Sequence, residues 1–307
     1  MDSHLIGETA AVITAGLWTA CSVLFESAGR RIGALSVNAY RIVVAVVFLA
    51  STHLVLFHSV TPAASGTQWF YMGLSGVSGL ALGDFGYFGA LVLIGARRGV
   101  LLMSMAPIFS AIAGYFVLGE VLGPWHMIGI AVTLIGISVV ILEKEGHSSE
   151  LPVAGRQKFY GVLCGLGGSI GQGLGLVISK YGMLKAGSPS VPLNPLSATL
   201  IRMVVAAGFV WLFVVSSGKL RNVVGAGRDR KALSRTFAGA VTGPFVGVWL
   251  SMVAVTYAAA GVAATLMALV PVMVIPVLWI LYKQKTTWRG MLGASVAVLG
   301  VAILFMV

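Results

Sequence analysis

The stretch Arg41-Ile-Val-Val-Ala45 returns later in the chain as Arg202-Met-Val-Val-Ala206, with Ser36 and Ser197 each five residues before the arginine. The two copies lie 161 residues apart. Further along, a constant spacing of 164 residues relates six more pairs of residues, namely Gly83 and Gly247, Ala96 and Ala260, Pro107 and Pro271, Glu120 and Gln284, Gly129 and Gly293, and Gly136 and Gly300. A fixed period over so many small or special residues indicates an internal duplication.

The composition of the 307 residues points to a lipid environment. Hydrophobic residues make up 58% of the chain, charged residues only 9%, and the mean hydropathy is +0.98. Soluble domains carry roughly 25% charged residues, so this chain has too few charges to solvate a globular surface. The net charge of +11 would favour nucleic acid in a soluble protein. Here the basic residues lie between apolar runs, so we expect membrane lipid and no nucleic acid as a partner.

Ten apolar runs have the length of a membrane-spanning helix, which needs about 20 residues. They cover residues 7–26, 35–57, 70–93, 98–119, 124–142, 159–179, 196–217, 236–257, 262–282 and 288–306. The sequence therefore predicts an all-α membrane protein with two five-helix repeats, at 1–146 and 147–307. Because five is odd, the second repeat must cross the membrane in the opposite sense to the first. Inverted repeats are typical of secondary transporters, with the substrate site near the midplane between the halves.

The segment from Ala106-Pro107 to Leu118-Gly119-Glu120, followed by Gly129 and Gly136, resembles the signature of the EamA-like transporter family of the drug/metabolite transporter superfamily. Leu17-Trp18, Arg41 and the stretch Tyr87-Phe-Gly-Ala90-Leu91 fit the same pattern. The second repeat departs from it at Tyr282-Lys283-Gln284, where the family usually has Leu-Gly-Glu. The resemblance implies a transporter fold but no particular substrate, because that superfamily carries amino acids, sugars, nucleotide-sugars, choline, cationic drugs and lipid-linked groups.

Asp84 is the leading candidate for a functional residue. It lies deep within the third span, its counterpart in the second repeat is Val248, and no partner for it is evident. A charge at the centre of a bilayer costs about 2.5–3.5 kcal/mol on insertion scales, so its retention needs a reason. Tyr87 shares its helical face. We expect the two to bind a proton or a cationic part of a substrate; the structural alternative is a protonated Asp84 bonded to a neighbouring helix.

Five further side chains are candidates for substrate or proton binding. Gln172 lies in the middle of the sixth span, and Glu26 lies near the end of the first, where it also fits a boundary residue. Aromatic side chains that fit either a cavity wall or plain packing are Trp18, Trp249 and Tyr257.

The two arginines of the repeat, Arg41 and Arg202, lie about two turns inside their helices. From there a long arginine side chain can bring its guanidinium to the membrane interface or bond to backbone carbonyl groups. Their duplication favours a scaffold role, and a role in attracting an anionic substrate stays open. Glu120 is assigned to the tight turn after the fourth span, which we expect it to cap.

The sequence carries none of the motifs that place catalytic groups or metal ligands, such as His-Glu-x-x-His, Gly-x-Ser-x-Gly, a phosphate loop or paired cysteines. Cys21 and Cys164 both fall inside apolar runs. We therefore expect no enzyme, no cofactor and no metal site.

The basic residues predict the orientation. The connections after the odd-numbered spans contain sixteen lysines and arginines, whereas the opposite side has only Lys180 and Lys185. The positive-inside rule then places both termini outside the cytoplasm, in contrast to the family's usual arrangement. We expect an integral protein of the inner (cytoplasmic) membrane of a prokaryote.

Together these features predict a secondary transporter of a small organic metabolite, which works by alternating access and is coupled to protons or to exchange. The alternative is a translocase of lipids or lipid-linked headgroups. A membrane-embedded enzyme or a scaffold is the third and weakest reading. The expected partners are a small-molecule substrate and membrane lipid, and a homodimer is left open.

Overall fold

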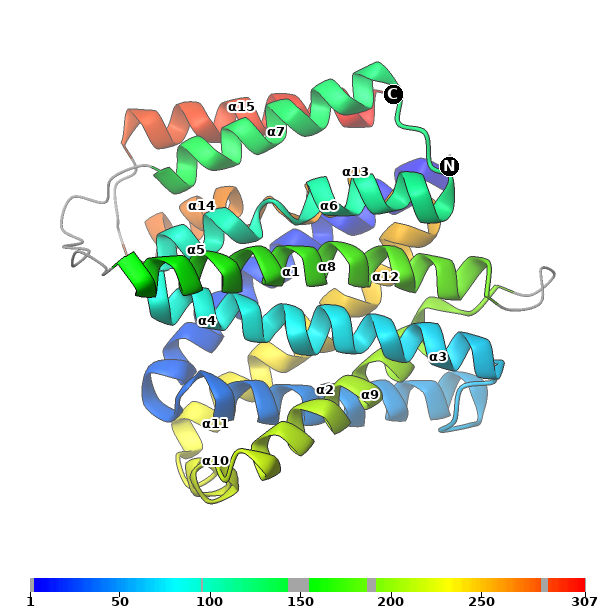
Figure 1. Ribbon diagram of the computed structural model, residues 1–307, viewed down its shortest axis with the longest axis vertical. Coiled ribbons are helices and arrows are strands. Elements are labelled where there is room, and N and C mark those ends of the chain that lie inside the picture. Colours follow the sequence, from blue (N-terminus) through cyan, green and yellow to red (C-terminus); the bar gives the residue numbers. More distant parts are fainter. Residues whose placement is uncertain (1–2, 95, 143–154, 187–191, 283–286, 307) are drawn as a thin grey trace.

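The computed structural model describes residues 3–94, 96–142, 155–186, 192–282 and 287–306 (Figure 1). The described residues are 88% helical and contain no strand. The helices, with three π-helical turns labelled η, are α1 (Ser3–Ile32), α2 (Ala34–Phe57), α3 (Gly66–Ser75), η1 (Gly76–Gly83), α4 (Asp84–Ile94), α5 (Ala96–Met103), α6 (Ala106–Ala113), η2 (Gly114–Leu118), α7 (Pro124–Leu142), α8 (Gly155–Leu184), α9 (Pro195–Ser216), α10 (Leu220–Ala226), α11 (Arg230–Ala240), η3 (Val241–Gly247), α12 (Val248–Tyr257), α13 (Ala260–Met267), α14 (Val270–Tyr282) and α15 (Trp288–Phe305).

The helix boundaries repeat with the period of the sequence. Helices α4, α5, α6 and α7 begin 164 residues before α12, α13, α14 and α15, respectively. The π-helical turns η1 and η3 end at Gly83 and Gly247, which have the same spacing. The two halves thus share breaks and turns as well as sequence, so the duplication is also one of structure. The predicted boundary between the repeats, at residues 146 and 147, lies outside the described residues.

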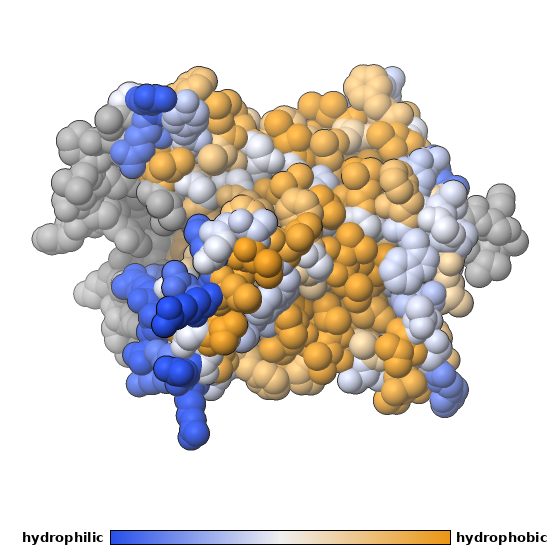
Figure 2. All heavy atoms as spheres, turned by 60° about the horizontal axis from the view of Figure 1, so that its bottom comes forward, coloured by the Kyte–Doolittle hydropathy of each residue, from blue (hydrophilic) through white to orange (hydrophobic). Residues whose placement is uncertain are grey.

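Nine helical runs among the described residues are long and apolar enough to cross a membrane. The predicted segment 70–93 is not among them, although α3, η1 and α4 follow one another without a break from Gly66 to Ile94. Figure 2 shows the expected surface, with apolar side chains across the middle of this face and hydrophilic ones at its two ends. The chain is an integral membrane protein.

The first helix of each half packs into the other half. Helix α1 contacts α11, η3, α12 and α13, whereas α8 lies against α3, η1, α4 and α6. Glycines make the second contact close: a Cβ on Gly171 would lie 2.7 Å from the carbonyl oxygen of Ser78, and one on Gly175 would lie 2.9 Å from Cα of Gly79. The glycine spacing in the sixth span predicts such close packing. The result is that polar groups on α8 reach the centre of the first half.

The last helices of the two halves, α7 and α15, lie side by side along one edge of the bundle (Figure 1). Four glycines lie at the contact between these helices, where a Cβ would collide with the facing helix: Gly129, Gly136, Gly293 and Gly300. These are four of the residues that the 164-residue period relates, and their shared role is to join the two halves.

Candidate functional site

Asp84 is the first residue of α4 and directly follows the π-helical turn η1. A π-helical turn inside an α-helix shifts the side chains that follow it, and such turns are frequent at functional sites. The second repeat has the equivalent π-helical turn, η3, but the residue that follows it is Val248. Both halves therefore keep the local geometry, and only the first half places a carboxylate on it.

Asp84 is paired, contrary to the expectation that it stands alone. An ion pair joins its Oδ2 to Nη2 of Arg41 on α2, and the two side chains are 13% and 17% exposed. Arg41 also donates from Nε to Oδ1 of Asn38 at 2.8 Å. Gln172 on α8 donates from Nε2 to Oδ1 of Asp84 at 3.1 Å. We call Arg41, Asp84 and Gln172 the central network, because they link two helices of the first half to one of the second.

Two aromatic rings flank the charged end of Arg41. Its guanidinium carbon lies 5.4 Å from the ring centroid of Phe25 on α1 and 6.0 Å from that of Phe88 on α4. Arginine favours such positions, where the ring face stabilises the cation. The guanidinium is thereby held between α1 and α4. The side chain thus points into the bundle and meets a carboxylate there, instead of reaching the membrane interface.

Tyr87 does not join the central network. It is half-buried one turn beyond Asp84, and its ring lies 5.7 Å from that of Phe88. Among the described residues it forms no hydrogen bond with Asp84, although the two share a helical face. That the two side chains bind a proton or a cationic group together stays a prediction.

Glu26 lies away from the central network, at the end of α1. It is exposed and pairs with Arg30 at 2.6 Å, one turn further along the same helix. Exposed pairs of this kind contribute little to stability. The reading of Glu26 as a boundary residue fits this placement.

Two of the three aromatic candidates lie close to the same cluster, and the third lies apart. The ring of Trp18 packs against η3: a Cβ added to Gly247 would lie only 2.8 Å from Nε1 of Trp18. Trp249 stacks with Phe245 at a centroid distance of 6.3 Å. Both tryptophans border the apolar cluster that contains Val248. Tyr257, at the end of α12, is 43% exposed. The structure brings the two tryptophans to one cluster and leaves Tyr257 outside it.

Arg202 differs from its repeat counterpart Arg41. It is only 3% exposed on α9, and its Nη1 donates to Sδ of Met252 at 2.8 Å. No carboxylate pairs with it among the described residues. The two arginines thus occupy equivalent positions in the two repeats but bond to different partners.

Glu120 bonds to a different turn from the one predicted. Its Oε2 accepts a hydrogen bond from the backbone N–H of Ala260 at 2.8 Å, and its Oε1 lies 2.6 Å from Nζ of Lys180. Lys180 also donates to the carbonyl of Ala258 at 2.5 Å. Glu120 therefore caps the start of α13 in the second half instead of its own turn. The Glu120–Lys180 pair ties the two halves together at the end of the bundle opposite the basic helices α10 and α11.

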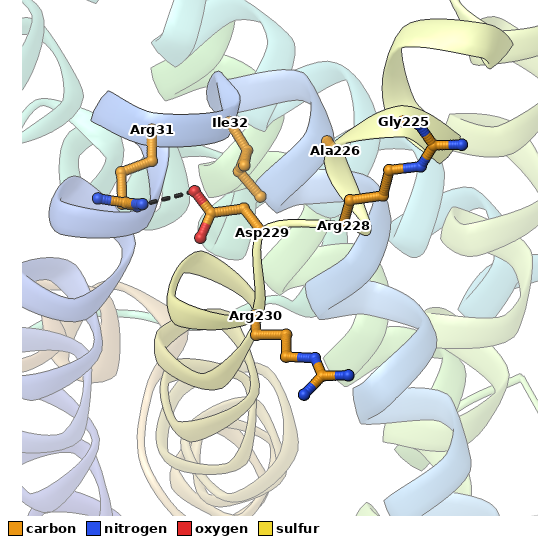
Figure 3. Close-up of a pocket in the computed structure, with 7 residues that line it drawn as sticks. All are labelled: Arg31, Ile32, Gly225, Ala226, Arg228, Asp229 and Arg230. Atoms are coloured by element: carbon orange, nitrogen blue, oxygen red, sulfur yellow. Dashed lines mark hydrogen bonds and ion pairs between the residues drawn. The ribbon is translucent and has the colours of Figure 1, made fainter.

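A shallow pocket lies at that basic end (Figure 3), lined by Arg31, Ile32, Gly225, Ala226, Arg228, Asp229 and Arg230. Asp229 accepts from the backbone N–H of Ala232 and from Nε of Arg31 at 2.8 Å, and these bonds lower its pKa. The Arg228 and Arg230 guanidiniums point away from each other (Figure 3). The side chains do not converge on one ligand, so the central network is the better candidate site.

Comparisons with known proteins agree with the fold. The sequence profile of the EamA-like transporter family matches residues 5–142 and again residues 159–306. No curated protein matches the sequence. Among solved structures, one described only as "Crystal structure of protein" is similar over 99% of this chain and 96% of its own, with a TM-score of 0.75 and 16% sequence identity. At that identity the likeness concerns the fold.

Proposed function

The chain belongs to the EamA-like transporter family, and from this premise we propose that it is a secondary transporter that moves a small organic metabolite by alternating access. Members of this family are membrane transporters, not enzymes. The observation that carries the proposal is the central network, in which Arg41, Asp84 and Gln172 bring polar groups from both halves together inside an apolar bundle.

The central network has the chemistry for coupling. One oxygen of Asp84 holds Arg41 and the other holds Gln172. A proton or a cationic substrate group that binds Asp84 competes with both partners. Since Gln172 belongs to α8, its release loosens a link between the two halves. Binding at Asp84 is thereby connected to helix movement, which fits either proton coupling or exchange.

We further propose ten spans in two inverted repeats. Both ends of the described chain lie on the same side of the bundle (Figure 1), which requires an even number of crossings. The run from α3 to α4 supplies a tenth span beside the nine that are apolar enough on their own. The equivalent helices α7 and α15 run in opposite directions, as do α1 and α8 (Figure 1). These directions support the inversion.

The function is tested by the thermal unfolding midpoint of the detergent-purified chain in the presence of soluble metabolites and of lipids. We expect a soluble metabolite to raise the midpoint, because a ligand at 100 times its Kd stabilises by about 2.7 kcal/mol. Asp84→Asn should lose this response, and the exposed carboxylate variant Glu26→Gln should keep it. Stabilisation by lipids alone would contradict the proposal and favour a lipid translocase.

For the orientation, we propose that both termini lie outside the cytoplasm, in the inner membrane of a prokaryote. The basic residues of α10, α11 and the neighbouring helix ends lie at the end of the bundle away from the termini (Figure 1). Basic segments stay on the cytoplasmic side. A reporter that is active only in the cytoplasm, fused to the carboxyl terminus, should be inactive. A strong cytoplasmic signal would refute this orientation.

A further inference from the structure

Arg202 carries a positive charge that no group of the described chain balances. Its side chain is buried, its Nε has no hydrogen-bond partner, and the hydrogen bond from its Nη1 goes to the thioether sulfur of Met252. A thioether is a weak acceptor. Buried charges are normally paired or fully hydrogen-bonded, because leaving water costs them their solvation. The guanidinium of Arg202 is thus supplied with fewer acceptors than its burial requires.

The repeat shows which group is missing. Arg41 and Arg202 are equivalent, and Arg41 meets Asp84, the first residue of α4. The equivalent first residue of α12 is Val248, which is buried. Arg202 meets Met252, one turn further along α12. The second half therefore keeps the arginine and the π-helical turn of the first half but has an apolar side chain where the carboxylate would be.

Arg202 borders the central network. An added Cβ on Gly79 would lie 3.5 Å from Nη2 of Arg202 and 3.6 Å from Oε1 of Gln172. Both side chains thus reach the same point on η1, and Gln172 continues to Asp84 through its other amide atom. Counting the charges of Arg41, Arg202 and Asp84, the centre of the bundle has one positive charge in excess.

We propose that Arg202 binds an oxyanion of the substrate, a single carboxylate or phosphate group, which fills the role that Asp84 has beside Arg41. The inference rests on the proposed transport function and names the substrate class. The oxyanion replaces the sulfur of Met252 as acceptor and neutralises the excess charge. The rest of the substrate then lies toward Gln172 and Asp84.

The position of Val248 allows a sharp test. Val248→Asp supplies Arg202 with an internal carboxylate, whereas Val248→Asn is its uncharged match in shape. The measurement is the thermal unfolding midpoint of the purified full chain in acetate or methyl phosphate, against chloride at equal ionic strength. We expect one of the two oxyanions to raise the midpoint of the wild type and of Val248→Asn. Acetate as the effective anion identifies a carboxylate, and methyl phosphate identifies a phosphate.

Val248→Asp and Arg202→Met should both bind the effective anion at least about tenfold more weakly, because one fills the site from within and the other removes its charge. Ligand-free Val248→Asp should also unfold at a higher temperature than Val248→Asn. Equal anion responses in the two Val248 variants, or no response in the wild type, would overturn the inference. If a soluble metabolite still stabilises the chain in that case, the transport function stands and only the role of Arg202 fails.

Discussion

Asp84→Asn is expected to abolish the pH dependence of transport while the protein still reaches the membrane. Asparagine keeps the shape of the side chain but cannot take up a proton, and it leaves the guanidinium of Arg41 without its carboxylate. Removing one partner of a buried charge pair costs about 2–5 kcal/mol. We therefore expect the transport rate to fall by roughly thirtyfold or more, the factor that corresponds to at least about 2 kcal/mol.

The measurement is uptake of the stabilising metabolite into proteoliposomes, with and without an imposed pH gradient. The wild type should respond to the gradient, and Asp84→Asn should not. Because the lone Arg41 charge destabilises the single variant, the double variant Arg41→Gln with Asp84→Asn serves as a folded and neutral comparison. Glu26→Gln, which removes an exposed carboxylate, should behave as the wild type. An unchanged response to the gradient in Asp84→Asn would refute proton binding at this residue.

The fold could be predicted largely because each apolar run is bounded by charges, glycine or proline. The predicted span 124–142 coincides with α7, and 196–217 differs from α9 by one residue at each end. The short helix α10 and the three π-helical turns were not predicted. A π-helical turn depends on how a helix packs on its neighbours, and no residue pattern of one helix specifies it. Tertiary packing decides these details.

The sequence singled out all three members of the central network, Asp84, Gln172 and Arg41, but it did not predict their contacts with one another. Asp84 is conspicuous because a carboxylate inside an apolar run is costly. Its partners lie 43 and 88 residues away on other helices, so no local spacing reveals them. Treating Arg41 and Arg202 alike, because they are duplicated, hid their difference. The sequence did hold a signal for this difference, because Asp84 of the first repeat corresponds to Val248 of the second. With a carboxylate in only one repeat, only one of the two arginines can have it as a partner.

Glu120 shows the same limit. A glutamate in a tight turn between two apolar runs is typical of a local cap. The structure instead places its carboxylate on Lys180 and on the backbone of Ala260, both in the second half of the chain. Breaking such a buried pair is costly when only one partner leaves. We expect opening of the bundle at this end to separate the two side chains.

The proposed alternating access has a direct consequence at Ser78. This residue lies on η1, and its hydroxyl donates to the carbonyl of Gly171 at 3.1 Å, next to Gln172 of the central network. Ser78→Cys changes the side chain little and places a thiol there. With Cys21 and Cys164 replaced by alanine, this thiol is the only one in the chain. Ser234→Cys, on the exposed surface of α11, is the control.

The most direct test of a central site that is reached from both faces is the reaction of Ser78→Cys with a membrane-impermeant thiol reagent, applied separately to each side of oriented vesicles. We predict that the reagent modifies this cysteine from both sides, and that it modifies Ser234→Cys from one side only. Modification from the side of the Glu120–Lys180 pair requires that pair to open. Modification of Ser78→Cys from a single side, or from neither, would contradict the account.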